Sequence, residues 1–186
     1  MIAQLSISRA VSQPDLVCQK SLHTLVVLII SLLTTPVVSS SELEVQIRPL
    51  SAIDTHYMTE QRKSVEALAN RLGRRISGKT ARDLETLQYI IDSRWIDAED
   101  IQTQQALGIV FGDLLASELN FDWVIYRDRA GRSRALRYRN QDIFVFPITM
   151  LARRLSAGAD LSVSVLFDEQ VRKQRQRLPG ARWMPQ

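Results

Sequence analysis

Cysteine and histidine are scarce in this chain, and their scarcity excludes several classes of chemistry. The 186 residues include one cysteine, Cys18, and two histidines, of which His56 alone lies beyond the N-terminal apolar run. Zinc and copper sites normally use several such ligands, and a disulfide needs two thiols. The sequence therefore predicts no transition-metal site and no disulfide, and we expect no cofactor.

Motifs for phosphate binding and nucleophilic catalysis are also missing. The sequence has no Walker loop, no dinucleotide-type glycine run and no nucleophile elbow, so a Ser-His-Asp triad would have to use His56 without one. The formal net charge of +4 comes from the C-terminal end, where five cations without an acid leave the rest of the chain at −1: Arg172, Lys173, Arg175, Arg177 and Arg182. Because the body is not basic, we predict no nucleic-acid-binding surface.

One long apolar run is present near the N-terminus. Residues 25–33, LVVLIISLL, follow Lys20 and precede a stretch of small residues that ends at Ser40. A basic flank, a short apolar core and small residues are typical of a secretory signal peptide. We therefore predict a signal over residues 1–40 and a periplasmic or secreted protein. An uncleaved inner-membrane anchor and a cytoplasmic chain are the alternatives.

The best-patterned stretch covers residues 105–119. We expect it to belong to a helix that Asp97 caps, that starts near Ala98 and that ends at Asn120. Its apolar residues recur at steps of three and four and cover about half of the helix circumference: Leu107, Val110, Phe111, Leu114, Leu115 and Leu119. Gly108, Gly112 and Ala116 form a second row at steps of four. Since glycine costs about 1 kcal/mol relative to alanine inside a helix, we expect a strand or helix to approach this row closely. A ligand cleft and a second copy of the chain are the alternatives.

The remaining patterns predict an α+β fold. We expect further helices over about 59–72, capped by Thr59, over about 81–94, with Trp95 closing the core beneath it, and over 148–156. Ser162 should cap a last helix whose inward residues are Val163, Leu166, Phe167 and Val171. Short strands are expected at 123–127, 135–138 and 143–146. Short turns between the strands indicate a three-stranded antiparallel meander, with the helices packed on it and residues 107–119 beneath it. The predicted organisation is a signal segment (1–40), an N-terminal arm (41–58), a single α+β domain (59–171) and a basic tail (172–186).

Four segments carry a resemblance to a known family. They are LGIVFGD at 107–113, WVIYRDRAG at 123–131, ALRYR at 135–139 and FPITMLARR at 146–154. Over about residues 107–167 the chain resembles the bacterial family called domain of unknown function 3806. The resemblance implies a small α+β domain without an assigned activity, often preceded by an export signal.

Three carboxylates are the only candidates for catalysis, and they belong to the alternative in which the protein is an enzyme. Glycosidic chemistry needs two carboxylates at a defined separation, and Glu118 with Asp113 or Asp128 would supply them if they converged. Such a protein would be a carboxylate-dependent hydrolase of an envelope polymer. Glu118 falls within the apolar arc of its helix, so it must either emerge at the end of the core or meet an arginine.

Arginines are the candidates for binding. We predict that Arg134, Arg137 and Arg139 line one exposed face of the sheet and hold carboxylate or phosphate groups. In the basic tail, Trp183 is suited to contact with a membrane surface. The leading hypothesis is a non-catalytic interaction module of the bacterial envelope, which binds another protein or an anionic envelope component. A solvated sheet face and a frayed helix end are the alternatives, and no oligomeric state is predicted.

Overall fold

The structure, a computed structural model, describes residues 45–179. The predicted signal segment and Trp183 lie outside the described residues. The elements follow one another as β1 (Gln46–Pro49), α2 (Ala52–Arg71), α3 (Thr80–Asp92), α4 (Ile101–Leu119), β2 (Asp122–Asp128), β3 (Gly131–Arg137), β4 (Phe144–Val145), α5 (Pro147–Ser156) and α6 (Val163–Arg177). The predicted α+β fold class is confirmed. Between residues 45 and 179, no helix is both long and apolar enough to cross a membrane.

The sheet is antiparallel with the order β1-β2-β3-β4, so it has one strand more than the predicted meander. The additional strand comes from the segment predicted as an arm, where Ile47 lies opposite Tyr126 of β2. Pro49 can end β1 without loss because β1 is an edge strand. At the other edge, β4 has two residues and pairs Val145 with Leu136.

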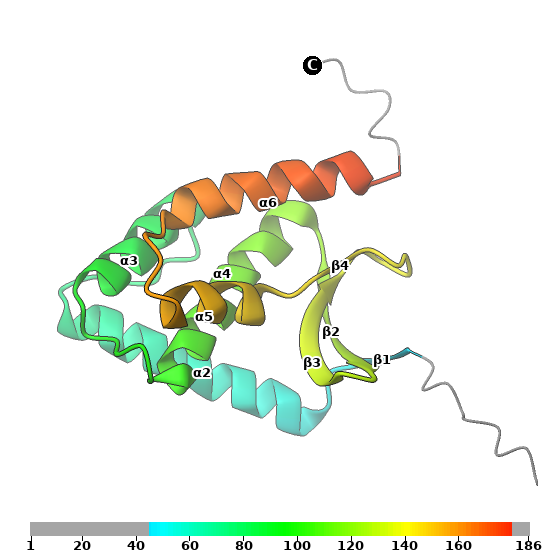
Figure 1. The fold of residues 1–186 in the computed structure, drawn as a ribbon, viewed down its shortest axis with the longest axis horizontal. Helices are drawn as coiled ribbons and strands as arrows, with labels where there is room; N and C mark the ends of the chain where they lie inside the picture. Colours follow the sequence, from blue (N-terminus) through cyan, green and yellow to red (C-terminus); the bar gives the residue numbers. More distant parts are fainter. Residues whose placement is uncertain (1–44, 180–186) are drawn as a thin grey trace, which may run out of the picture. The chain divides into compact units, whose positions relative to one another are not determined.

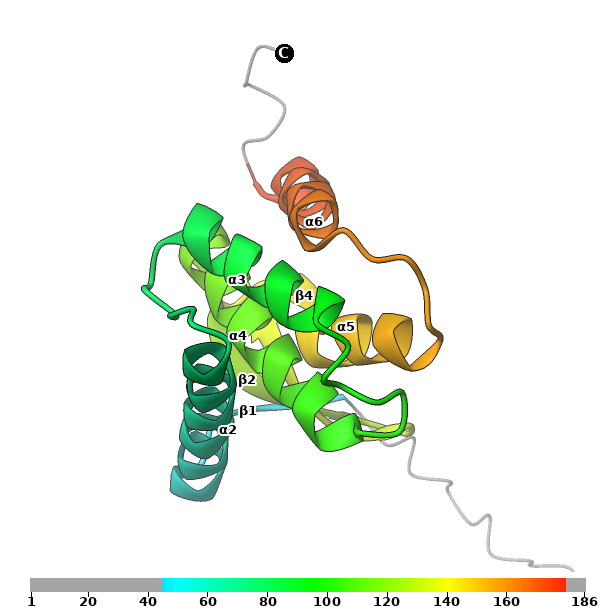
Figure 2. The same ribbon diagram turned by 90° about the vertical axis from the view of Figure 1, so that its left-hand side faces the viewer.

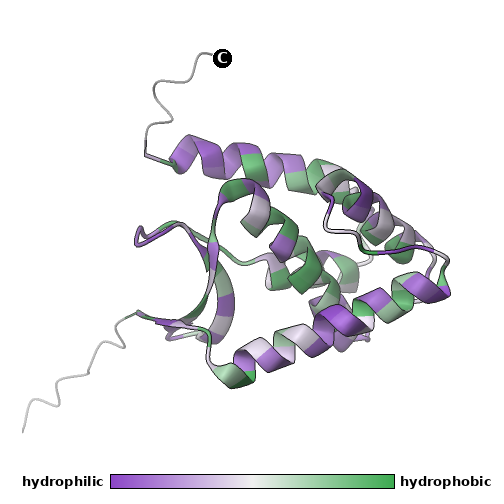
Figure 3. Cartoon of the chain, turned by 180° about the vertical axis from the view of Figure 1, so that it is seen from behind, coloured by the Kyte–Doolittle hydropathy of each residue, from purple (hydrophilic) through white to green (hydrophobic). Residues whose placement is uncertain are grey.

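The apolar helix α4 lies at the centre of the helices and does not lie beneath the sheet. It packs mainly against α5 and α2, with smaller contacts to α6 and α3 (Figure 1; Figure 2). Its apolar colour contrasts with the polar outer faces of α2 and α6 (Figure 3). All six predicted core residues of α4 are buried. The predicted position under the meander is wrong because helices, not strands, cover most of the apolar arc.

The glycine row of α4 is the place where other elements come closest. A Cβ atom on Gly108 would lie 2.6 Å from the Cα atom of Ile148 in α5. A Cβ atom on Gly112 would lie 2.5 Å from the ring of Trp123 and 2.7 Å from the ring of Pro147. The predicted close approach is confirmed. Since α5 and Trp123 cover this row, it is available neither as a ligand cleft nor for packing a second copy.

Helix α2 begins earlier than predicted. Ser51, not Thr59, is its N-cap: the backbone N–H of Asp54 donates to Ser51 Oγ, and the Asp54 carboxylate accepts from the backbone N–H of Ser51. This capping box is a strong start signal. Apolar periodicity alone places the start of the helix too late, because it becomes clear only after Thr59. Most of the predicted arm is therefore ordered as β1 and the first turns of α2.

Two other details near α4 differ from prediction. Asp100, not Asp97, is its N-cap, accepting a hydrogen bond of 3.0 Å from the backbone N–H of Thr103. Trp95 was expected to close the core under α3, but it is 59% exposed. The predicted C-terminal end is confirmed, since Asn120 has φ 55° in the left-handed region.

The last two helices follow the prediction closely. Pro147 is at the first turn of α5, where its missing N–H costs nothing. Ser162 caps α6, and the four predicted inward residues are all buried: Val163, Leu166, Phe167 and Val171. Helix α6 continues through the basic segment to Arg177, so the first part of the predicted tail is helical.

Candidate functional site

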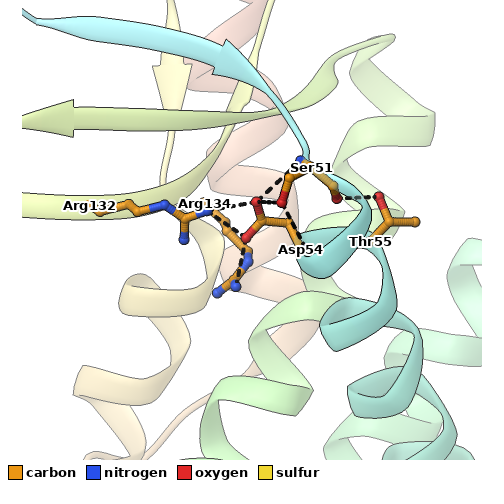
Figure 4. Close-up of polar contacts among 5 residues, drawn as sticks. All are labelled: Ser51, Asp54, Thr55, Arg132 and Arg134. Carbon is orange, nitrogen blue, oxygen red and sulfur yellow. Dashed lines mark hydrogen bonds and ion pairs between the residues drawn. The ribbon is translucent and has the colours of Figure 1, made fainter.

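A buried carboxylate, Asp54, joins the start of α2 to the sheet. Its side chain is 3% exposed and accepts hydrogen bonds from Arg132 Nη2 at 2.6 Å to both oxygens, from Arg134 Nη2 at 2.9 Å and from Ser51 Oγ at 2.7 Å (Figure 4). The guanidinium of Arg134 also lies over the ring of Tyr57, 4.2 Å from its centroid. These contacts hold α2 against β3.

The electrostatics of Asp54 favour a permanent negative charge. Burial alone raises the pKa of its carboxyl, but the hydrogen bonds from Arg132 and Ser51, together with the positive charge of Arg132, lower that pKa well below its usual range. A carboxylate with such a low pKa is a poor general acid or base. We therefore assign Asp54 a structural role.

Asp113 is the centre of a second polar cluster. Arg62 donates to both of its oxygens, at 2.6 Å from Nε and 2.8 Å from Nη2, and Trp123 Nε1 donates at 2.9 Å. The hydrogen bond to Asp113 raises the pKa of Arg62 above its ordinary value. The cluster links α2, α4 and β2, and it leaves Asp113 engaged on both oxygens.

The other two candidate carboxylates have different partners. Glu118 pairs with Arg175 of α6, so it meets an arginine in a partly exposed position. Asp128 ends β2 and accepts a hydrogen bond from the backbone N–H of Ala130 in the turn. Asp113, Glu118 and Asp128 therefore contact different elements, and these contacts do not bring them together. Within residues 45–179, no group of three or more histidine, cysteine or acidic residues could hold a metal ion.

The three predicted binding arginines do not share one face of the sheet. Arg134 and Arg137 are three residues apart on β3, which puts their side chains on opposite faces. Arg134 pairs with Asp54, whereas Arg137 donates to the backbone oxygens of Asn140 and Gln141. Arg139 follows the strand with φ 47° and is exposed. The prediction that the three arginines share one face is wrong, because side chains alternate between the two faces along β3.

Four cations line a cleft between α5 and α6: Arg153, Arg154, Lys173 and Arg177. This cleft, which we call the basic cleft, has a volume of about 330 Å³. Strand β4 and the residue after it supply Phe144, Val145 and Phe146, α5 supplies Thr149, Met150, Arg153 and Arg154, and α6 supplies Gln170, Lys173, Gln174 and Arg177. No acidic residue between positions 45 and 179 lines it.

The four cations of the basic cleft have no carboxylate partner in the described part of the chain. Arg154 donates to the backbone oxygen of Met150, and Arg177 donates to the side chain of Gln174. Arg153 and Lys173 have no hydrogen bond or ion pair with any residue in the described part of the chain. By contrast, Arg62, Arg132 and Arg175 are each paired with a carboxylate. The cleft therefore brings together four cations that have no carboxylate partner within residues 45–179.

Two glutamines lie on the inner face of α6 at this cleft. Gln170 is 6% exposed and Gln174 is 3% exposed. Gln174 accepts from Arg177, but the Gln170 amide has no hydrogen-bond partner within residues 45–179. A structural glutamine in the same domain behaves differently: Gln104 donates to two backbone oxygens and accepts from Ser156. Gln170 is thus a largely buried residue whose amide atoms are not closed off from solvent and remain available in the cleft.

The sequence contains one signal for this cleft, in the inward positions of α6. The inward positions of α6 continue from Val163, Leu166 and Phe167 at helical spacing to Gln170 and Gln174. Polar amides at positions where apolar residues would normally stand are a reason to expect a site. The approach of α5 and β4 had no sequence signal, because it depends on tertiary packing.

The fold and the cleft describe a small α+β domain with a basic, partly apolar site, and comparison with known proteins agrees with the sequence resemblance. Residues 83–167 match the model of the family described as "Domain of unknown function (DUF3806)". The predicted resemblance to this family is therefore confirmed over the segment from α3 to the first turns of α6. No curated protein matches the chain.

A solved structure has a similar fold. It is a crystal structure from Bacteroides thetaiotaomicron VPI-5482 at 1.50 Å resolution, with a TM-score of 0.63 and 18% sequence identity. The similarity covers 72% of this chain and 49% of that one, so this chain spans about half the length of its structural neighbour. At this identity the similarity concerns the fold alone.

Proposed function

We propose that this protein is a non-catalytic binding module of the bacterial envelope that holds an anionic partner in the basic cleft. The observation that carries the proposal is the set of four cations lining one cleft without a carboxylate partner in the described chain: Arg153, Arg154, Lys173 and Arg177. The partner is another protein or an anionic envelope component.

Electrostatics support a ligand of opposite charge. Like charges gathered in one cleft repel one another, and a concave surface with apolar walls concentrates their field. An anion with two or more carboxylate or phosphate oxygens would relieve the repulsion and form charge-assisted hydrogen bonds with the arginines. The cleft thus replaces the hairpin arginines as the proposed binding surface, since Arg134 and Arg137 already have internal partners.

The side chains of the basic cleft favour binding over catalysis. The described residues that line it include no carboxylate, histidine or cysteine, and the one hydroxyl among them belongs to Thr149. Asp113 and Glu118, the acids of the alternative hydrolase, are paired with Arg62 and Arg175. No contact of these acids favours the hydrolase, and we do not propose it.

A titration with an anionic probe tests the proposal. We expect a fluorescently labelled oligo-glutamate to bind the purified protein saturably, with an affinity that falls as salt is added. The double variant Arg153→Ala/Lys173→Ala should bind about five- to tenfold more weakly, because two charge-assisted contacts are lost. Fluorescence anisotropy gives both affinities.

A matched control separates the cleft from general charge. Arg71 and Arg172 are exposed, do not line the cleft and have no ion pair in the described chain. The double variant Arg71→Ala/Arg172→Ala removes the same charge and should bind as the unmodified protein does. Equal losses in the two double variants, or no saturable binding at all, would contradict the proposal.

The envelope location rests on the predicted signal, and it has a separate test. The apolar run at 25–33 and the small residues up to Ser40 motivate the expectation of cleavage after Ser39 or Ser40. Expression in a Gram-negative host followed by N-terminal sequencing of the periplasmic fraction should give a mature chain that starts at Ser40 or Ser41. A chain that keeps its N-terminus and stays in the cytoplasm would remove the envelope from the proposal.

A further inference from the structure

We infer that the occupant of the basic cleft is an extended acidic peptide segment of a partner protein, in which a carboxylate side chain stands next to an apolar one. This inference rests on the proposed function and specifies its ligand. Three features of the cleft carry it: the apolar floor, the unpartnered amide of Gln170 and the size.

The lining of the cleft has an apolar part, which we call the apolar floor, and four cations, which we call its rim. Phe144 and Phe146 are half-buried, and both rings pack edge-on against Tyr126, with centroids 5.1 and 5.2 Å from the centroid of that ring. Val145 and Met150 complete the floor. A fully hydrated anion does not bury this apolar surface. An apolar side chain does, and each Å² of apolar surface that it buries stabilises the complex by about 25 cal/mol. The occupant therefore has an apolar part beside its charge.

The amide of Gln170 distinguishes a peptide from a phosphate. A glutamine side chain offers two N–H donors and a carbonyl acceptor, whereas a fully ionised phosphate only accepts hydrogen bonds. A peptide group, with one N–H and one C=O, satisfies both ends of the amide. The Gln170 amide is accessible in the cleft, so a ligand that fills the cleft takes water away from it and must replace those hydrogen bonds. A ligand that carries peptide groups does so at both ends of the amide.

The size of the cleft limits how much of the partner enters it. A volume of about 330 Å³ lies at the lower end of the range of about 300–1,000 Å³ for ligand sites. Such a cleft holds one or two side chains of an extended segment rather than a folded surface. The four rim cations lie on two helices, so carboxylates on both sides of the apolar side chain find partners.

Calorimetry with two short peptides tests the ligand class. The first has phenylalanine flanked on both sides by glutamates, and the second has serine in place of the phenylalanine. We expect the first peptide to bind at least about tenfold more tightly, because the second leaves the apolar floor in water. Oligo-glutamate should resemble the serine peptide, and inorganic phosphate and vesicles of anionic phospholipid should bind more weakly than the phenylalanine peptide.

The variant Gln170→Met tests the amide itself. Methionine keeps the length of the side chain and all of the cations but removes the hydrogen-bonding groups. We expect about a five- to tenfold loss of affinity for the phenylalanine peptide and no loss for inorganic phosphate. Thermal unfolding shows whether the variant is folded, and Arg153→Ala, at an exposed position, provides a second variant that does not depend on the core.

The outcomes separate this inference from the proposed function. If all of the anions bind through Arg153 and Lys173 but the two peptides have equal affinity and Gln170→Met changes nothing, the peptide inference is wrong and the proposed function stands. The peptide inference is equally wrong if phosphate or anionic vesicles bind as tightly as the phenylalanine peptide. If no anion binds, both fail.

Discussion

At the scale of single residues, Asp54 shows how a short-range pattern and a long-range contact combine. It completes the capping box with Ser51 and accepts charge-assisted hydrogen bonds from Arg132 and Arg134, which lie 78 and 80 residues further along the chain. Local hydrogen bonds start the helix, and the arginines attach it to β3. One buried side chain thus couples the N-terminal end of the described chain to the centre of the sheet.

Asp54→Asn should destabilise the domain by about 2–3 kcal/mol at neutral pH. The change removes the buried negative charge that pairs with Arg132 and Arg134. The loss of unfolding free energy is moderated because water still reaches Arg132. Urea unfolding followed by circular dichroism measures the effect. Glu60→Gln on the same helix is the matched control, since Glu60 is exposed and pairs only with Lys63. Similar unfolding midpoints for the two variants would contradict the role of Asp54.

The pH dependence of this effect has a definite sign. The pKa of Asp54 is lower in the folded state than in the unfolded state, so its contribution is fully present above the unfolded pKa of about 3.9. It is lost as the pH falls from there towards the lower folded pKa. The difference in unfolding free energy between the unmodified protein and Asp54→Asn should therefore shrink below about pH 4. A difference that stays constant down to lower pH would contradict the assignment.

Asp54 also shows what sequence alone could and could not provide at this scale. The spacing of Ser51 and Asp54 is a local signal for the start of a helix. It predicts that α2 begins after Ser51 rather than at Thr59, as observed. The contacts with Arg132 and Arg134 had no local signal, because they depend on the register of β3 against its neighbours. The same limit explains why the hairpin arginines were placed on one face.

At the scale of elements, helix α4 organises the domain through what its surface lacks. The missing side chains of Gly108 and Gly112 allow α5 and Trp123 to pack directly against its backbone. Periodicity predicted the helix, its buried arc and the close approach, because these depend on the residues of one segment. Which element would approach was not predictable, since α5 lies about forty residues further along the chain.

Gly108→Ala tests this packing. In an exposed helix the substitution stabilises by about 1 kcal/mol, but here the new Cβ atom would lie 2.6 Å from the Cα atom of Ile148. We expect a loss of about 1–3 kcal/mol in unfolding free energy, because α5 must move. Chemical denaturation provides the measurement, with Gln102→Ala at an exposed position of the same helix as control. A more stable Gly108→Ala protein would show that α5 does not pack this closely.

At the scale of the whole molecule, the division of its positive charges is the basis for the functional proposal. Arg62, Arg132, Arg134 and Arg175 are paired with Asp113, Asp54 or Glu118, whereas the four cations that line the basic cleft have no carboxylate partner in the described chain. The sequence showed a basic C-terminal segment. It did not show that α6 would place Lys173 and Arg177 opposite Arg153 of α5. Only the fold combines these charges into one site.

The most direct test of this account maps an anion onto the protein. Labelled with ¹⁵N, the protein is titrated with oligo-glutamate, and its two-dimensional NMR spectra are followed, including the side-chain amide of Gln170. We predict that the largest shifts fall on the cleft residues Arg153, Gln170, Lys173 and Gln174 and that they saturate together. Shifts spread evenly over exposed basic residues such as Arg71 and Arg172, with Gln170 unaffected, would contradict the account.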